Sequence, residues 1–291
     1  MQAVILTAGR GERLKPVSDH VAKPLLPFWG KPFVSYVLDN LRGGVEDVVL
    51  VVGPDGQVEH ALGSSYGDLP LRYATQLEPG GTGAALLAAR ELLDEDFLLI
   101  LGDTCPPPET VREIIARPGD AALTVVKVDD PGNHAQVGIH DGLVVERLWV
   151  HDSDLVDAGM FRLPKLVCDY LDQVEPVRGE VRILSGIDAL IEAGLEVRAV
   201  RMPGPWLQYG DHEGVSGICR VMDQIRPYAG GADSGQDSSI HPTIHHRDCY
   251  IRNSLVFGSG ELIDCNITGS VVYCEGRAEQ RSAVGAIAVW P

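Results

Sequence analysis

Short apolar runs alternate with segments of helical periodicity through the first half of the chain. The apolar, partly β-branched runs predict buried strands at residues 3–6, 47–52, 71–74, 97–101 and 121–128. Apolar residues at helical spacing predict helices at residues 33–41, 58–62 and 84–93. This alternation predicts an α/β fold with a Rossmann-like sheet, mixed but mostly parallel, and helices on both faces of the sheet.

The alternation continues less regularly up to residue 226. A hairpin is predicted from residues 135–139 and 143–148, joined across Asp141-Gly142. Further strands are predicted at residues 156–161 and 196–200, and further helices at residues 166–171 and 187–193. We therefore assign residues 1–226 to one large domain.

The C-terminal part has a different pattern. Residues 227–237 are rich in Gly, Asp and Ser, which is typical of a linker. From residue 238, aliphatic residues recur near six-residue spacing, which predicts a short left-handed β-helix over residues 238–291. Residues 276–291 depart from this repeat, so we expect an irregular tail there. An ordinary small β-sheet is the alternative.

The first predicted strand leads directly into a glycine turn. Gly9 and Gly11 allow a close approach of backbone N–H groups to a ligand, and successive N–H groups form a concave anion site. Arg13 adds a guanidinium suited to phosphate oxygens, and Lys23 adds a second cation. The segment therefore predicts a nucleoside triphosphate site, although two glycines alone also fit a plain strand-to-helix turn.

Three linked motifs narrow this hypothesis. The strings LTAGxGxRLxP, KPLLP and GKP follow one another in the first 32 residues. Together they resemble the N-terminal motif of the sugar-1-phosphate nucleotidylyltransferases, in particular the glucose-1-phosphate thymidylyltransferases and uridylyltransferases. That family joins a nucleoside triphosphate to a sugar 1-phosphate and releases pyrophosphate. The resemblance makes residues 1–226 the catalytic domain, with Arg13 and Lys23 as catalytic residues. It assigns nucleotide contacts to Leu6, Ala8, Gly9 and Gly11.

A polar segment follows the third predicted strand. The amide of Gln76 donates and accepts hydrogen bonds at once, which suits the edge of a nucleobase. The glycines at 80 and 81 leave room for a flat ring. A loop with a helix cap is the alternative, but the resemblance favours base recognition by Gln76 and Gly81.

An acidic residue ends the fourth predicted strand. The carboxylate of Asp103 follows the apolar residues 97–101 and needs a partner there, which a hard divalent ion with phosphate oxygens supplies. A cap on the following turn is the alternative. The resemblance implies that Asp103 binds Mg²⁺, the expected cofactor.

The half that binds the sugar phosphate, which we call the acceptor half, departs from the family pattern. The resemblance implies acceptor contacts from Gly138, Gly159 and Glu180. The usual Glu-Lys-Pro is absent, because residues 149–151 are Trp-Val-His, and Arg147 or His151 takes the place of the lysine. The second metal ligand, usually Asp, is Gln208, with Asp211 as a substitute, and Ser185 stands where the family commonly has Asp. We therefore expect an unusual acceptor, or a weak or silent nucleotide-binding regulatory homologue.

Composition and net charge limit the kinds of partner that the protein can bind. The chain has 291 residues and a formal net charge of −17, which would repel nucleic acid and an anionic membrane surface. It has six cysteines without a Cys-x-x-Cys pair, no apolar run long enough to span a membrane and no signal peptide, so we expect a cytoplasmic protein. The expected substrates are dTTP or UTP and a sugar 1-phosphate, in a homo-oligomer assembled through the β-helix. An acyltransferase or scaffolding role of that β-helix is the least favoured alternative.

Overall fold

A computed structural model describes residues 1–291 except 133, 142–143, 204–205, 210–213 and 229–236. Most of the predicted linker, residues 227–237, therefore lies outside the described residues. The chain forms two compact units. The sheet unit comprises residues 1–9 and 37–206, and the loop-coil unit comprises residues 10–36 and 207–291. This division differs from the predicted boundary at residue 226, because most of the glycine-rich opening segment belongs with the C-terminal residues.

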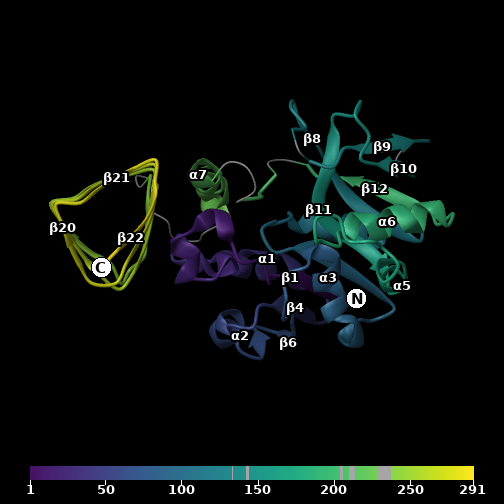
Figure 1. The fold of residues 1–291 in the computed structure, drawn as a ribbon, viewed down its shortest axis with the longest axis horizontal. Helices are drawn as coiled ribbons and strands as arrows, with labels where there is room; N and C mark the ends of the chain where they lie inside the picture. Colours follow the sequence, from purple (N-terminus) through teal and green to yellow (C-terminus); the bar gives the residue numbers. More distant parts are fainter. Residues whose placement is uncertain (133, 142–143, 204–205, 210–213, 229–236) are drawn as a thin grey trace. The chain divides into compact units, whose positions relative to one another are not determined.

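A mixed sheet forms the centre of the sheet unit (Figure 1). Its strands are β1 (Gln2–Leu6), β4 (Val48–Val52), β5 (Ser65–Tyr66), β6 (Leu69–Thr75), β7 (Asp96–Leu101), β8 (Ala121–Lys127), β9 (Val137–His140), β10 (Val144–Leu148), β11 (Leu155–Pro164) and β12 (Val197–Arg201). They lie in the order β5-β6-β4-β1-β7-β11-β8-β12-β10-β9. The predicted hairpin is present, because β9 and β10 pair antiparallel.

The prediction of a mixed sheet is confirmed, and the antiparallel strands interrupt its parallel part at defined places. Strands β6, β4, β1 and β7 are parallel to one another, and so are β8 and β12. Strand β11 lies between β7 and β8 and is antiparallel to both, and β10 is antiparallel to β12. Apolar runs are similar in either orientation, so the sequence pattern does not reveal these reversals.

Helices cover both faces of this sheet, as predicted. They are α1 (Phe33–Leu41), which begins in the loop-coil unit, α2 (Gln57–Leu62), α3 (Gly81–Ala88), α4 (Pro108–Ala116), α5 (Val167–Leu171) and α6 (Ile183–Glu192). Helices α3, α5 and α6 contact one another and share a core with the sheet through Leu86, Leu171 and Ile187 (Figure 1). All five residues of β1 are buried, so residues of both orientations are covered and neither face is open to solvent.

The loop-coil unit begins with short turns and a small hairpin. Three 3₁₀ turns span Glu12–Leu14, Val17–Asp19 and Lys23–Leu25, and strands β2 (Pro27–Phe28) and β3 (Lys31–Pro32) pair antiparallel. Phe28, Phe33 and Tyr209 pack edge to face, with ring centroids 4.5–5.6 Å apart. Such aromatic packing stabilises a segment that has little regular structure of its own. Helix α7 (Gly214–Ile225), which is not among the predicted helices, contacts the first 3₁₀ turn.

The rest of the unit is a three-sided coil of parallel strands (Figure 1). Its strands are β13 (Ser239–Ile240), β14 (His245–Arg247), β15 (Tyr250–Arg252), β16 (Leu255–Gly258), β17 (Glu261–Ile263), β18 (Asn266–Thr268), β19 (Val271–Cys274), β20 (Arg277–Glu279), β21 (Ser282–Val284) and β22 (Ile287–Trp290). Leu255 pairs with Val271, and Val271 with Ile287, so one turn takes 16 residues. The first four strands begin six, five and five residues apart, so the expected six-residue spacing is shortened on two sides.

The prediction of an irregular tail at residues 276–291 is wrong. Strands β20, β21 and β22 pair in register with β17, β18 and β19. Ala278 and Ala283 are buried there, where the turns before them have larger aliphatic residues. The small side chains conceal the aliphatic repeat in the sequence while leaving the backbone ladder intact.

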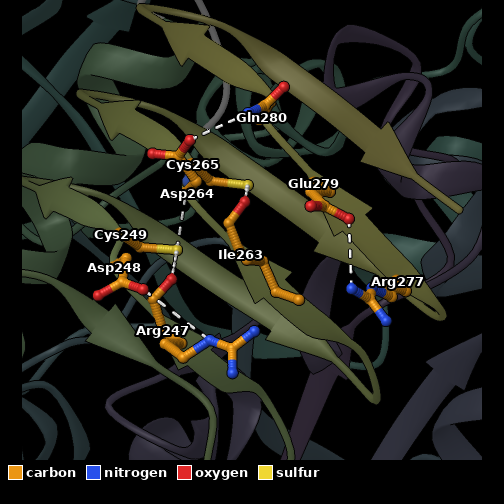
Figure 2. A network of polar contacts seen from close by, with 9 residues as sticks. All are labelled: Arg247, Asp248, Cys249, Ile263, Asp264, Cys265, Arg277, Glu279 and Gln280. Carbon is orange, nitrogen blue, oxygen red and sulfur yellow. Dashed lines mark hydrogen bonds and ion pairs between the residues drawn. The ribbon is translucent and has the colours of Figure 1, made fainter.

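One corner of the coil repeats exactly the same backbone turn. Asp248, Asp264 and Gln280 follow one another at 16-residue intervals, with left-handed φ values of 57°, 50° and 52° (Figure 2). Cys265 N–H donates to Cys249 Sγ at 3.4 Å, and Gln280 Nε2 donates to Asp264 Oδ2 at 3.3 Å (Figure 2). Asp tolerates this conformation more readily than most residues, and the turn leads the chain from one side of the coil to the next.

Among the described residues, no helix is both long and apolar enough to cross a membrane.

Candidate active site

The opening glycine turn follows strand β1. Gly11 has a φ of 61°, and a Cβ added to it would lie 3.2 Å from Ser18 Cβ and 3.4 Å from Lys23 Cβ. A larger residue at position 11 is therefore both strained and crowded. The structure brings two predicted site residues together here, since Gly11 packs against Lys23. Gly9 has open space instead, with nothing within 4 Å of an added Cβ.

Asp103 follows strand β7, the neighbour of β1. Gly102 N–H donates to Leu6 O at 3.0 Å, and a Cβ added to Gly102 would lie only 2.2 Å from that oxygen. Only glycine permits this approach, which fixes the ends of the two strands against each other. The half-buried Asp103 therefore directly follows a residue that contacts Leu6, one of the predicted nucleotide contacts.

Arg13 and Lys23 belong to the loop-coil unit. Arg13 is exposed on a 3₁₀ turn whose next residue, Leu14, is buried and anchors the turn. Lys23 is held by Tyr209, whose hydroxyl donates to Lys23 O at 2.5 Å and whose ring centroid lies 5.0 Å from Lys23 Nζ. A cation over an aromatic face is attracted by the ring, so Tyr209 orients both ends of the lysine. Sequence reasoning missed Tyr209, although it directly follows the predicted metal ligand Gln208.

The opening loop is also braced by α7 and the coil within its own unit. Trp29 N–H donates to Ser239 Oγ at 2.7 Å, and Trp29 Nε1 donates to Met222 O at 2.8 Å. His20 stacks on Tyr273, with ring centroids 4.8 Å apart. The loop that carries the predicted catalytic cations is therefore supported from three separate segments of the chain.

The predicted base-binding and sugar-binding segments lie side by side. Gly81 has a φ of 88°, and an added Cβ would lie 2.6 Å from Val181 O and 3.0 Å from Glu180 Cβ. Gly83 N–H donates to Val181 O at 2.8 Å, and Val181 N–H donates to Gly80 O at 2.7 Å. The structure therefore brings the predicted residues Gly81 and Glu180 together, 99 residues apart in the chain.

Gln76 has an unusual environment for an amide. Its backbone N–H donates to Val52 O at 2.9 Å, which continues the pairing of β6 with β4. Its side-chain Nε2 is buried and has no hydrogen-bond partner among the described residues. A buried amide without a partner is costly, so a ligand atom that accepts from Nε2 would relieve the penalty.

Gly159 lies beside the end of strand β7. It has a φ of 83°, and an added Cβ would lie 2.7 Å from Thr104 Oγ1, so the structure brings Gly159 close to the residue after Asp103. Within the described ranges, Thr104 Oγ1 is buried without a hydrogen-bond partner. Gly159 N–H donates to Asp157 Oδ1 at 2.9 Å, and burial raises the pKa of Asp157 to about 7. The sequence signal for Asp157 was an acid inside the apolar run 155–161, and it was overlooked.

The remaining predicted residues are less fully defined. Gly138 and Arg147 are register partners in the β9–β10 hairpin, so the backbone brings them together. The side chain of Arg147 and all of Asp211 lie outside the described residues. Gln208 is half-buried between the buried residues Leu207 and Tyr209.

The donor set suits Mg²⁺ in its usual protein setting. Mg²⁺ is commonly bound by one or two protein oxygens and completed by substrate phosphates, rather than enclosed by a protein cage. Asp103 of the sheet unit offers one carboxylate, and Gln208, the predicted second ligand, belongs to the loop-coil unit. In the part of the chain that the structure describes, no three His, Cys, Asp or Glu side chains gather as a metal site.

The sequence profile of the nucleotidyl transferase family matches residues 2–218. The chain therefore belongs to this family, and the resemblance to sugar-1-phosphate nucleotidylyltransferases is confirmed. It is 30% identical over 272 residues to a glucose-1-phosphate thymidylyltransferase of Streptomyces griseus, covering 89% of this chain and 76% of the relative. It is 33% identical over 223 residues to the UTP–glucose-1-phosphate uridylyltransferase AglF of Haloferax volcanii, covering 72% of this chain and 91% of the relative.

A third relative is longer. The bifunctional protein GlmU of Methanococcus maripaludis is 30% identical over 218 residues, and the match covers 72% of this chain but only 51% of the relative. A solved structure of UDP-glucose pyrophosphorylase complexed with UDP-glucose superposes with a TM-score of 0.68 at 17% identity, covering 78% of this chain and 98% of that one. At this identity the likeness shows the fold, and it confirms an α/β fold with a mixed central sheet.

Proposed function

We propose that the protein transfers a nucleotidyl group from a nucleoside triphosphate to a sugar 1-phosphate. A phosphate oxygen of the sugar 1-phosphate attacks the α-phosphorus in line, the bond to the β-phosphate oxygen breaks, and pyrophosphate leaves. The observation that carries the proposal is the contact of Gly102 with Leu6 O, which fixes the end of β7, just before Asp103, against the end of β1. A family whose profile spans three quarters of the chain supports the same reaction.

The residues act by positioning and by neutralising charge, since phosphoryl chemistry of this kind needs no covalent intermediate. Arg13 holds the β- and γ-phosphates through its guanidinium. Lys23, oriented by Tyr209, stabilises negative charge on the α-phosphoryl oxygens. Mg²⁺, with Asp103 and Gln208 or Asp211 as protein ligands, supplies neutralisation of the phosphate oxygens when bound.

The nucleobase partner we propose is thymine or uracil. Gln76 Nε2, buried and without a partner among the described residues, suits a carbonyl oxygen at the edge of a base. Among the relatives, one is named a thymidylyltransferase and another a uridylyltransferase, which agrees with dTTP or UTP as the donor. Gly81 packs directly against Glu180 and Val181, so adjoining segments would contact the base and the sugar of the product.

A silent regulatory homologue is less well supported. The substitutions at 149–151, 185 and 208 motivate it, but the relatives that span most of this chain carry enzyme names.

We also propose that the coil is left-handed and mediates homo-oligomer formation, and that the protein is cytoplasmic. The six cysteines are all free thiols, as expected in a reducing compartment.

Release of pyrophosphate tests the proposed reaction. Each of dTTP, UTP, ATP, GTP and CTP is combined with a panel of sugar 1-phosphates and Mg²⁺. We expect turnover with dTTP or UTP, and a loss of about 10²-fold or more in Asp103→Asn and in Lys23→Gln. Asp68→Asn, which removes a carboxylate from an exposed pair with Arg42, is the matched control and should keep full activity. Nucleotide binding without pyrophosphate release across the whole panel would favour the silent homologue.

A further inference from the structure

Trp149 is held in an unusual position at the end of strand β10. Its φ of 59° lies in the left-handed region, which a bulky side chain rarely adopts, and its side chain is 39% exposed. The preceding residue, Leu148, is buried, and its N–H donates to Asp188 Oδ1 of α6 at 3.3 Å. The surrounding structure therefore fixes an exposed indole where the family resemblance leads us to expect a Glu-Lys-Pro segment. Strain of this kind tends to gather at functional sites.

Arg182 places its guanidinium over this indole. Its carbon Cζ lies 5.5 Å from the centroid of the Trp149 ring. Arg182 precedes α6 in an extended conformation, with φ −98° and ψ 142°. Because neighbouring side chains in an extended segment alternate in direction, Arg182 projects to the same side as Glu180. Their 3.9 Å separation, from Arg182 Nε to Glu180 Oε2, agrees with this.

The residue between them projects to the opposite side. Val181 packs inward, with Cγ1 only 2.8 Å from a Cβ built on Gly83. This packing anchors the segment to helix α3, while the side chains of Glu180 and Arg182 remain 56% and 46% exposed. Three side chains from two distant segments, Trp149, Glu180 and Arg182, therefore form one surface, which we call the Trp149 cluster.

The chemistry of the cluster suits a phosphorylated sugar. A guanidinium that lies on an aromatic face keeps its charge, and its N–H edge remains available for two parallel hydrogen bonds to a phosphate. The indole also limits the conformations of the arginine, so less entropy is lost when the phosphate binds. A carboxylate such as Glu180 accepts hydrogen bonds from sugar hydroxyls.

The geometry points to Arg182 as the residue that binds the phosphate of the acceptor sugar 1-phosphate, with Trp149 as its positioning residue. The acceptor class is a hydroxylated sugar 1-phosphate, bound by the phosphate at Arg182 and by a hydroxyl at Glu180. This inference rests on the proposed function.

Steady-state kinetics of pyrophosphate release test it, with each substrate varied while the other is saturating. In Arg182→Gln we expect the KM for the sugar 1-phosphate to rise at least 10-fold, while the KM for the nucleotide changes less than 2-fold. Arg182→Lys should restore part of the loss, because it keeps the charge but not the paired hydrogen bonds. Trp149→Leu should raise the sugar 1-phosphate KM several-fold with the arginine still present. Arg42→Gln, which removes an equal charge from an exposed ion pair, is the matched control.

The outcomes separate this inference from the proposed reaction. If wild-type protein releases pyrophosphate and Arg182→Gln has an unchanged sugar 1-phosphate KM, the assignment of Arg182 is wrong and the reaction stands. An equal rise in both KM values, or a fall in kcat with a lowered melting temperature, would reveal a structural role and would also overturn the assignment. If wild-type protein is inactive with every sugar 1-phosphate, the proposed reaction fails and this inference fails with it.

Discussion

At the scale of single residues, the most informative side chains are polar groups that the fold buries next to predicted ligand contacts. Gln76 Nε2 and Thr104 Oγ1 are buried without partners in the described part of the chain, and Asp157 has a pKa raised to about 7 by burial. Soluble domains rarely keep such groups without a reason, since each one lowers stability. All three lie in the sheet unit, close to residues that the resemblance assigns to nucleotide or sugar.

The raised pKa of Asp157 predicts a pH-dependent stability. Its usual value is 3.8, so the folded protein holds the proton more tightly than the unfolded chain does. The free energy of unfolding should therefore fall as the pH rises from about 4 to about 7, by about 4 kcal/mol. Asp157→Asn keeps an acceptor for Gly159 N–H and removes the titration.

Melting temperatures of wild type and Asp157→Asn between about pH 3.5 and 8.5 provide the measurement. The variant should gain stability over wild type as the pH rises, and the two curves should converge below about pH 4. Parallel curves would show that the Asp157 carboxyl does not titrate in this range. Asp68→Asn, at an exposed pair, is the control for a simple loss of charge.

At the scale of elements, the sequence predicts individual strands and helices better than it predicts their arrangement. The predicted helix at residues 33–41 coincides with α1, and the predicted strand at 97–101 differs from β7 by one residue. The antiparallel insertion of β11 was missed because a run buried on both faces carries no sign of direction. Helix α7 was missed altogether, although its buried residues Ile218, Val221, Met222 and Ile225 have helical spacing.

In the candidate site, too, individual residues were easier to predict from the sequence than the contacts between distant segments. Glycines and charged residues in local motifs, such as Gly11 and Asp103, were recognisable because each signal lies within a few residues. The contacts of Tyr209 with Lys23, and of Trp149 with Arg182, join segments 186 and 33 residues apart. No local pattern specifies such a pair, so they become visible only when the chain is folded.

The junction of α3 with residues 180–183 yields an element-scale prediction. A methyl group at position 83 would lie 2.8 Å from Val181 Cγ1 and 3.0 Å from Val181 O. Gly83→Ala should therefore separate the two segments, lower the free energy of unfolding by about 1–3 kcal/mol and raise the KM of both substrates. Denaturant unfolding and pyrophosphate release measure these effects. Gly44→Ala is the control, because its added Cβ meets only ordinary contacts of 3.4 Å or more, and comparable losses there would contradict the explanation.

At the scale of the whole molecule, the chain does not divide into an N-terminal enzyme and a C-terminal appendage. The loop-coil unit joins residues 10–36 to residues 207–291, so the coil shares a compact body with Arg13 and Lys23. The bracing contacts at His20 and Trp29 give the coil a part in positioning that loop. A role limited to subunit assembly would not require these contacts.

Replacing Tyr273 distinguishes a role of the coil in positioning the opening loop from a role in subunit assembly. Tyr273→Leu removes the ring that stacks on His20, so we expect the KM for the nucleotide to rise about 3- to 10-fold with an unchanged oligomeric state. Pyrophosphate release and size-exclusion chromatography give the two readouts. Tyr250→Leu, at a 56% exposed position on another side of the coil, should leave both unaltered. A change of oligomeric state alone in Tyr273→Leu would limit the coil to assembly.

The fixed length of the coil's turn has a consequence for how this protein tolerates insertions and deletions. Inward positions recur every 16 residues, so loss of a single residue would rotate every later inward side chain out of its place in the interior. Gain of a whole turn would instead lengthen the coil by about 4.8 Å and leave all earlier strand pairings intact. Insertions and deletions in this part of the chain should therefore be tolerated in multiples of one complete turn. Homologues with a longer or shorter coil can then keep the same opening loop.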